Sequence, residues 1–91
     1  MKAAVLHGQR DVRVEEIPTP EPGPGEALIR VGMTGVCGSD IPRVLSDGAH
    51  FYPLVLGHEI AGEVAAVGAD ADPGLVGRRV AVAPLLPCHQ C

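Results

Sequence analysis

The chain has 91 residues, 46% of them hydrophobic, and a chain of this length buries roughly 60% of its unfolded surface, enough for one small domain. The net charge of −4 comes from scattered acidic residues without a Lys/Arg cluster, which argues against nucleic acid as a partner. The apolar stretch at residues 3–6 is too short for a signal peptide or a membrane span, so we expect a cytoplasmic protein with no membrane partner.

Frequent glycines and prolines limit the secondary structure that the chain can form. Twelve glycines and nine prolines interrupt the chain too often for long helices, and valine and isoleucine dominate the segments between them. This composition predicts a mostly β fold. The three cysteines are an odd number in a chain without a secretion signal, which favours a metal-binding or redox role over a disulfide framework.

The first elements expected along the chain are two strands of a hairpin. Residues 2–7 and 11–17 form this pair, because valines alternate with charged residues in the second segment, and Gly8 is placed in the turn. Alternate prolines then fix φ and remove backbone donors in residues 18–24. We expect this stretch to be an extended connector rather than a strand.

A longer strand and a short helix are expected next. From Ala27 to Met33 the odd-numbered residues are apolar and should share one face of a strand that leads toward Cys37. A short helix over residues 40–45 follows, with a serine or aspartate as its N-cap. Further strands are predicted over 59–67 and 79–83, separated by a polar loop at 68–77.

Three residues offer the ligand types that zinc accepts. Cys37, His58 and Glu59 carry a thiolate, an imidazole and a carboxylate, and each follows a glycine-marked break. Because consecutive strand residues point to opposite faces, His58 and Glu59 can share one metal only if the backbone after Gly57 departs from strand geometry. Taken singly, each also has a plain structural interpretation: a buried thiol, a structural histidine and a solvated carboxylate.

Two motifs carry a resemblance to a known family. Gly57-His58-Glu59, with Gly62 and Gly68 following at fixed spacing, resembles the signature of zinc-containing alcohol dehydrogenases of the medium-chain dehydrogenase/reductase family. The segment 35–40, Gly-Val-Cys-Gly-Ser-Asp, is similar to the family's first ligand segment. The resemblance implies a GroES-like, partly open β-barrel with a short helix, the N-terminal catalytic domain of an alcohol dehydrogenase.

The resemblance also implies roles for individual residues. Cys37 and His58 would bind the catalytic Zn²⁺, and Glu59 would be a direct or outer-shell ligand, as in the polyol branch. Ser39 matches the hydroxyl that passes on the alcohol proton, and Asp40 matches the carboxylate that orients the ligand histidine; for both, helix capping is the alternative. Pro42 stands where many family members continue the proton relay with a histidine, so the proton needs another route.

The last residues carry a second metal-binding pattern. Cys88 and Cys91 form a C-x-x-C pair with no partner pair in the chain. They resemble the first two of the four cysteines that hold a structural zinc in this family, and two unconnected thiols are the alternative. We therefore expect residues 1–91 to be the N-terminal part of the GroES-like catalytic domain, truncated at the start of the structural zinc lobe.

Within the family, three short segments of the chain resemble enzymes of the polyol branch. Residues 39–43, 48–53 and 84–88 are similar to enzymes that oxidise galactitol-1-phosphate, so we expect a small-molecule polyol or polyol phosphate as the substrate. Arg43 could donate to the phosphate, and a solvated helix arginine is the alternative. The expected reaction is zinc-dependent oxidation of a secondary alcohol to a ketone with NAD(P), in an intact protein that is a homo-oligomer.

The nucleotide-binding part of such an enzyme is not expected in this chain. No G-x-G-x-x-G turn follows a strand, so the Rossmann domain is absent and the 91-residue chain alone should be inactive. The alternatives are a non-catalytic GroES-like β-barrel that serves as an interaction module, an inactive fragment, or a zinc-free quinone reductase. The combination of Cys37, His58 and Glu59 favours the zinc enzyme over each of these.

Overall fold

The computed structural model describes residues 1–91, which divide into two compact units. The first contains Met1–Glu21 and Val36–Gly57, and the second contains Pro22–Gly35 and His58–Cys91. The chain is mostly β with one α-helix, as its composition predicts. No helix has the length and the apolar character needed to cross a membrane.

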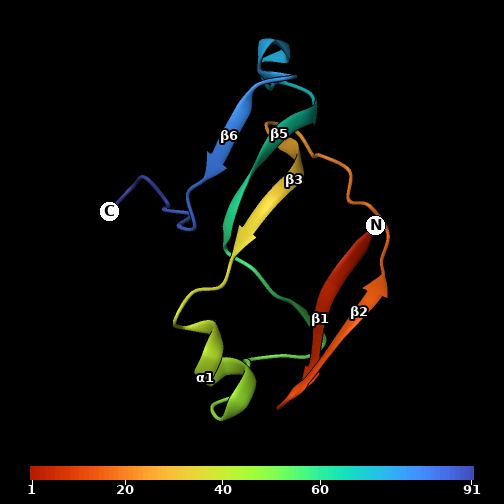
Figure 1. Ribbon diagram of the computed structural model, residues 1–91. Helices are drawn as coiled ribbons and strands as arrows, with labels where there is room; N and C mark the ends of the chain where they lie inside the picture. The colour runs from red at the N-terminus through yellow and green to blue at the C-terminus, as the bar shows by residue number, and fades with distance from the viewer. The chain divides into compact units, whose positions relative to one another are not determined.

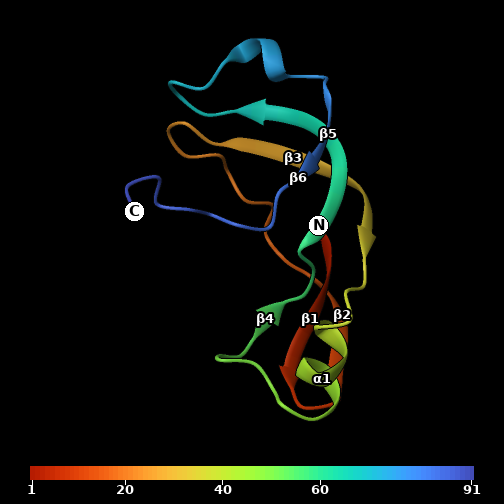
Figure 2. The ribbon, with the colours of Figure 1, turned by 90° about the vertical axis from the view of Figure 1, so that its left-hand side faces the viewer.

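The first unit contains a three-stranded sheet in the order β2-β1-β4, formed by β1 (Lys2–Gly8), β2 (Asp11–Glu16) and β4 (Leu54–Val55) (Figures 1 and 2). The predicted hairpin of β1 and β2 is confirmed. The placement of Gly8 in its turn is wrong, because Gly8 pairs with Asp11 after a register shift. The turn lies at Gln9 and Arg10, and Arg10 adopts a φ of 60°. The two-residue strand β4 was not predicted.

The core of the first unit lies in β1. Val5 is 4% exposed and Leu6 is fully buried, although consecutive strand residues point to opposite faces. The hairpin turn is tied to the helix α1 (Asp40–Leu45), because the Arg10 amide donates to the Val44 carbonyl at 2.7 Å and the Gln9 side chain donates to the Leu45 carbonyl at 2.7 Å. The helix has the predicted bounds.

The proline-rich stretch between the two units has no strand, as predicted. A turn at Pro24 and Gly25 ends it, and Gly25 has a φ of 76°, which favours glycine. The Gly25 amide donates to the Ala69 carbonyl at 2.6 Å. The connector therefore enters the following strand with its backbone already hydrogen-bonded.

The second unit contains an antiparallel sheet in the order β3-β5-β6, formed by β3 (Ala27–Gly35), β5 (Glu59–Val67) and β6 (Arg79–Val82) (Figure 1). A short 3₁₀ helix, η1 (Pro73–Leu75), occupies the predicted loop. The three strands agree with the prediction, with β6 ending one residue earlier. Val64 in the central strand is 2% exposed and forms the buried centre of this unit.

The single apolar face predicted for β3 is wrong. The register shift between Val31 and Met33 leaves Gly32 as an extra residue in β3 and interrupts the alternation, whereas the shift between Leu28 and Ile29 has its extra residue, Ala65, in β5. Bulges of this kind insert an extra residue and change the face to which later side chains point. Met33 is 75% exposed, whereas Leu28 is half-buried.

Candidate metal centre

The register of β3 and β5 brings the expected ligand segments to one end of this strand pair. Gly35, the last residue of β3, is paired with Glu59, the first residue of β5. Cys37 follows Gly35 by two residues, and His58 directly precedes Glu59. Each candidate ligand therefore lies within two residues of the paired strands β3 and β5. The hydrogen bonds between the strands fix the positions from which the ligand segments start.

The backbone before β5 departs from strand geometry, as a shared metal requires. Gly57 has a φ of 117°, a conformation that side-chain-bearing residues rarely adopt, and His58 lies in a bend. Regular strand structure starts only at Glu59. His58 and Glu59 are therefore freed from the strict alternation that would point them to opposite faces.

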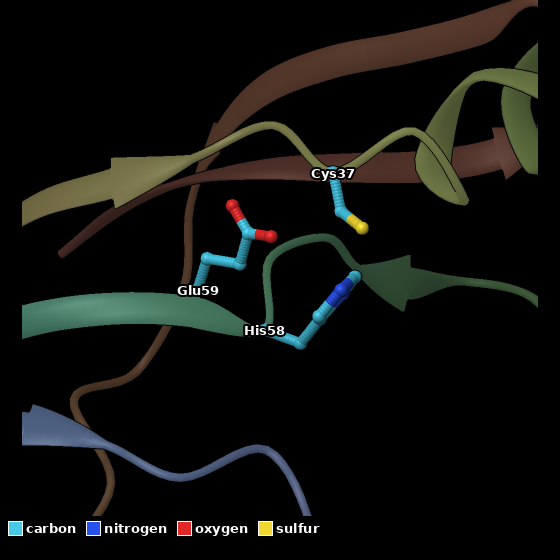
Figure 3. Close-up of side chains that lie close together, drawn as sticks. All are labelled: Cys37, His58 and Glu59. Carbon is cyan, nitrogen blue, oxygen red and sulfur yellow. The ribbon is translucent and has the colours of Figure 1, made fainter.

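The ligand atoms of Cys37, His58 and Glu59 all lie within 4.8 Å of one another (Figure 3). Ligands of a tetrahedral zinc lie about 3.4 to 3.6 Å apart, given metal–ligand bonds of about 2.0 to 2.3 Å. Cys37 and His58 are half-buried and Glu59 is exposed. The donor set of sulfur, nitrogen and oxygen fits Zn²⁺. No other cluster of His, Cys, Asp and Glu in the chain meets this criterion.

Gly35 provides the space in which the Glu59 side chain lies. A Cβ atom placed on Gly35 would be 3.2 Å from the Glu59 Cβ and would collide with its carboxylate. Because the two residues are register partners, the Glu59 side chain lies over the Gly35 backbone. The sequence analysis used Gly35 only as a motif residue, and the absence of a side chain opposite the acidic residue is the signal that could have indicated this role.

The segment around Cys37 is closed by Asp40. The Asp40 amide donates to the Cys37 carbonyl at 2.9 Å, and the Cys37 amide donates to Asp40 Oδ2 at 3.0 Å. Asp40 is 7% exposed and is the only buried charged residue. Arg43 Nη1 donates to the other carboxylate oxygen, Oδ1, at 3.3 Å. The carboxylate therefore connects the ligand segment to the last turn of α1.

Ser39 occupies the N-cap position of α1, but its side chain makes no capping hydrogen bond. Ser39 is exposed and lies in the sequence between Cys37 and the first residue of the helix. The alternative interpretation of Ser39 as the helix N-cap is therefore correct in position, but its backbone is in the helical region at φ −72° and ψ −20° rather than in the extended region typical of a capping serine. Its hydroxyl is not used by the helix.

A shallow, largely apolar groove of about 490 Å³ adjoins this end of the second sheet. His58 and Glu59 line it together with Met33, Val82 and Pro84. The groove is open to solvent, and its volume is within the range of sites that bind small organic molecules. The candidate ligands His58 and Glu59 are its only residues with charged or ionisable side chains.

Cys88 and Cys91 lie in the final irregular segment, both exposed, with their sulfur atoms 3.0 Å apart. The contact lowers the pKa of the Cys88 thiol and raises the pKa of the Cys91 thiol, as expected when Cys91 donates its S–H to the Cys88 sulfur. The structure therefore brings the two sulfurs of the C-x-x-C motif together, separate from the cluster of Cys37, His58 and Glu59.

Comparison with known proteins places the chain in a family. Residues 23–91 match the alcohol dehydrogenase GroES-like domain. The chain belongs to the alcohol dehydrogenase family. Across its full length it is 44% identical to the sorbitol dehydrogenase of Bacillus subtilis and 44% identical to the galactitol 1-phosphate 5-dehydrogenase of Escherichia coli K12. The GroES-like fold and the membership in the alcohol dehydrogenase family, inferred from the motifs, are thereby confirmed.

A solved structure shows the same fold. The crystal structure of an alcohol dehydrogenase from E. coli CFT073 in complex with NADH superposes on the whole chain with a TM-score of 0.92 and 35% identity, and the chain covers 26% of that structure. The chain spans 27% of the length of both curated relatives. This alcohol dehydrogenase chain therefore corresponds to the GroES-like part of such enzymes and does not include the Rossmann part.

Proposed function

We propose that the full-length protein carrying this chain oxidises a secondary alcohol of a polyol or polyol phosphate to a ketone, with NAD(P)⁺ as the hydride acceptor. The observation that supports this proposal is the proximity of Cys37, His58 and Glu59 within 4.8 Å. The names of the relatives, a sorbitol and a galactitol 1-phosphate dehydrogenase, support the substrate class. The NADH complex of the structural relative supports a nicotinamide cofactor.

In this proposal Cys37 and His58 hold the catalytic Zn²⁺, with Glu59 as a third or outer ligand. Zinc bound there would act as a Lewis acid that polarises the alcohol oxygen and makes its proton easier to remove. Ser39 is the exposed hydroxyl nearest the thiol in sequence, and its O–H is not committed to capping the helix. We assign it the first transfer of the alcohol proton, and because Pro42 has no ionisable side chain, the proton continues through water.

The groove beside His58 and Glu59 would receive the carbon chain of the substrate. Its apolar lining would contact the carbon atoms of the substrate, with the reacting hydroxyl directed to His58 and Glu59. We further propose that Cys88 and Cys91 are half of a structural zinc site, completed by two cysteines that follow residue 91. A closed tetrahedral site needs four ligands, so this chain supplies only half of it.

The test uses the full-length protein with the variants Cys37→Ser and Glu59→Gln, beside Glu63→Gln as a matched control. Glu63 is an exposed carboxylate on the same strand and has no ion pair. The wild type and Glu63→Gln should contain catalytic zinc and reduce NAD⁺ in the presence of galactitol-1-phosphate or sorbitol. Cys37→Ser should lose both the metal and the activity. A wild-type protein without metal at Cys37 and without polyol turnover would support a non-catalytic barrel instead.

A further inference from the structure

We propose that Arg43 is a positioning residue for the metal centre: its guanidinium holds the Asp40 carboxylate on the Cys37 amide and so presets the segment that presents the Cys37 sulfur. The inference rests on the proposed zinc site and adds a residue outside the ligand set. It starts from the closed ring between Cys37 and Asp40. Two hydrogen bonds, of 2.9 and 3.0 Å, tie the carbonyl and the amide of Cys37 to the same residue.

The Asp40 carboxylate is largely removed from water and pairs with the cation Arg43. Its side chain is 9% exposed, and a carboxylate removed from water is costly unless a charged or hydrogen-bonding partner compensates for it. Arg43, one helical turn later, donates to Oδ1 at 3.3 Å, while Oδ2 accepts from the Cys37 amide. Because the two oxygens have different partners, the guanidinium fixes the rotation of the carboxylate that aims Oδ2 at Cys37.

The charge of the site adds a second reason for a cation here. A zinc-binding Cys37 is a thiolate, and Asp40 and Glu59 contribute two more negative groups to the same segments. Arg43 supplies a cation that pairs with one of these groups, the Asp40 carboxylate. Its side chain is 38% exposed, so it stays partly hydrated while it compensates the buried carboxylate. Outer-shell partners of this kind change metal affinity by about 10- to 100-fold when removed.

Contact with a substrate phosphate is a different role for the same residue. Only one guanidinium nitrogen of Arg43 is engaged, by Asp40, which leaves other donors for an anion. The ion pair with Asp40 favours the positioning role, because it is a contact that the folded chain already makes. The two roles also differ in what they predict: positioning affects the metal in the absence of substrate, whereas phosphate contact affects only phosphorylated substrates.

The experiment compares Arg43→Met, Arg43→Lys and the control Arg13→Met in the full-length protein. Arg13 also forms a pair with an aspartate, Asp11, but on the exposed hairpin. Zinc affinity is measured by chelator competition at constant pH, and Co²⁺ is substituted so that the part of the thiolate-to-cobalt absorption that Cys37→Ser removes reports on Cys37. Arg43→Met should weaken zinc binding about 10- to 100-fold and alter the cobalt–thiolate band. Arg43→Lys should recover most of the affinity, and Arg13→Met should leave it unchanged.

A double-mutant cycle tests whether Arg43 acts through Asp40. In an Asp40→Asn background, Arg43→Met should have little further effect on zinc affinity, because the carboxylate that it positions is gone. Unchanged zinc affinity and an unchanged cobalt band in Arg43→Met would overturn the inference while leaving the zinc site intact. A selective loss of turnover with phosphorylated polyols, with normal metal binding, would instead assign Arg43 to phosphate recognition. A wild-type cobalt–thiolate band that Cys37→Ser leaves unchanged would overturn the proposed site itself.

Discussion

Gly35 and Glu59 face each other across β3 and β5, and the Glu59 side chain occupies the space that a side chain on Gly35 would need. In Gly35→Ala the new methyl group would collide with the carboxylate and approach the Glu59 Cβ to 3.2 Å. The carboxylate end is flexible and can move away, but the Cβ is attached to the strand. We therefore expect the Glu59 carboxylate to be displaced from the ligand group, with a loss of zinc affinity of about tenfold or more.

The measurement is zinc affinity by chelator competition in the full-length protein, with Gly38→Ala as the control. Gly38 directly follows Cys37, and a Cβ there meets no atom within 4 Å. The control therefore changes a glycine in the same segment without a collision. Equal zinc affinity in the two variants would show that the position of Glu59 over Gly35 is not needed for metal binding.

The buried centre of the first unit gives a prediction about stability. Leu6 is fully buried, so Leu6→Ala should lower the free energy of unfolding by about 2 to 5 kcal/mol through lost burial and the cavity that remains. Leu86→Ala is the matched control, because Leu86 is 99% exposed and should change stability by less than about 0.5 kcal/mol. Urea denaturation of the full-length protein, followed by circular dichroism, measures both. Similar unfolding midpoints for the two variants would contradict the observed burial of β1.

The hairpin contains an ion pair between Arg13 and Asp11 whose contribution to stability depends on pH. The Arg13 guanidinium donates to Asp11 at 2.8 and 2.9 Å and lowers the pKa of that carboxyl. A lowered folded-state pKa means that the pair stabilises the hairpin above the ordinary Asp pKa of about 3.9, and that this contribution is lost as the pH falls through the folded-state pKa. In Arg13→Gln the Asp11 titration should therefore move to higher pH. Carboxyl ¹³C chemical shifts measure it; an unchanged midpoint would show that the pair does not persist in solution.

Much of the fold could be predicted from local sequence signals. Glycines, prolines and alternating apolar residues correctly predicted three elements. These are the hairpin, the helix over residues 40–45 and the strand over 59–67. The bulge in β3 could not be predicted, because the position of an extra residue in a ladder depends on the partner strand, and the apolar residues of the sequence alternate without a break from Ala27 to Met33. Strand β4 has only two residues and exists through its pairing with Val5 and Leu6, so it carries no periodic signal of its own.

The candidate site was predictable in its ligand types but not in its supporting residues. The break at Gly57 was required in advance, and the positive φ of this residue meets the requirement. The function of Asp40 as acceptor for the Cys37 amide depends on side-chain rotation, which no residue pattern specifies. The spacing of Asp40 and Arg43, three residues apart on a helix, was a usable signal for their ion pair, since residues at this spacing are neighbours on a helix surface.

The two sulfurs of the C-x-x-C motif should differ in reactivity. Thiolates rather than thiols react with alkylating agents, and the hydrogen bond with Cys91 lowers the pKa of Cys88 and raises that of Cys91. In the presence of a chelator, iodoacetamide should therefore modify Cys88 before Cys91, and the pH profile of Cys88 alkylation should lie at lower pH. Peptide mass spectrometry separates the two sites from each other and from Cys37.

The variants Cys91→Ala and Cys91→Ser test the cause of this difference. Alanine removes the donor, so the pKa of Cys88 should rise and its alkylation profile should shift to higher pH. Serine keeps an O–H group near the Cys88 sulfur, so it should preserve part of the lowered pKa. Equal profiles in the wild type and Cys91→Ala would mean that the 3.0 Å contact does not form in solution. A lowered Cys88 pKa that depends on Cys91 would instead show that the motif holds one sulfur ready for deprotonation, as a zinc ligand requires.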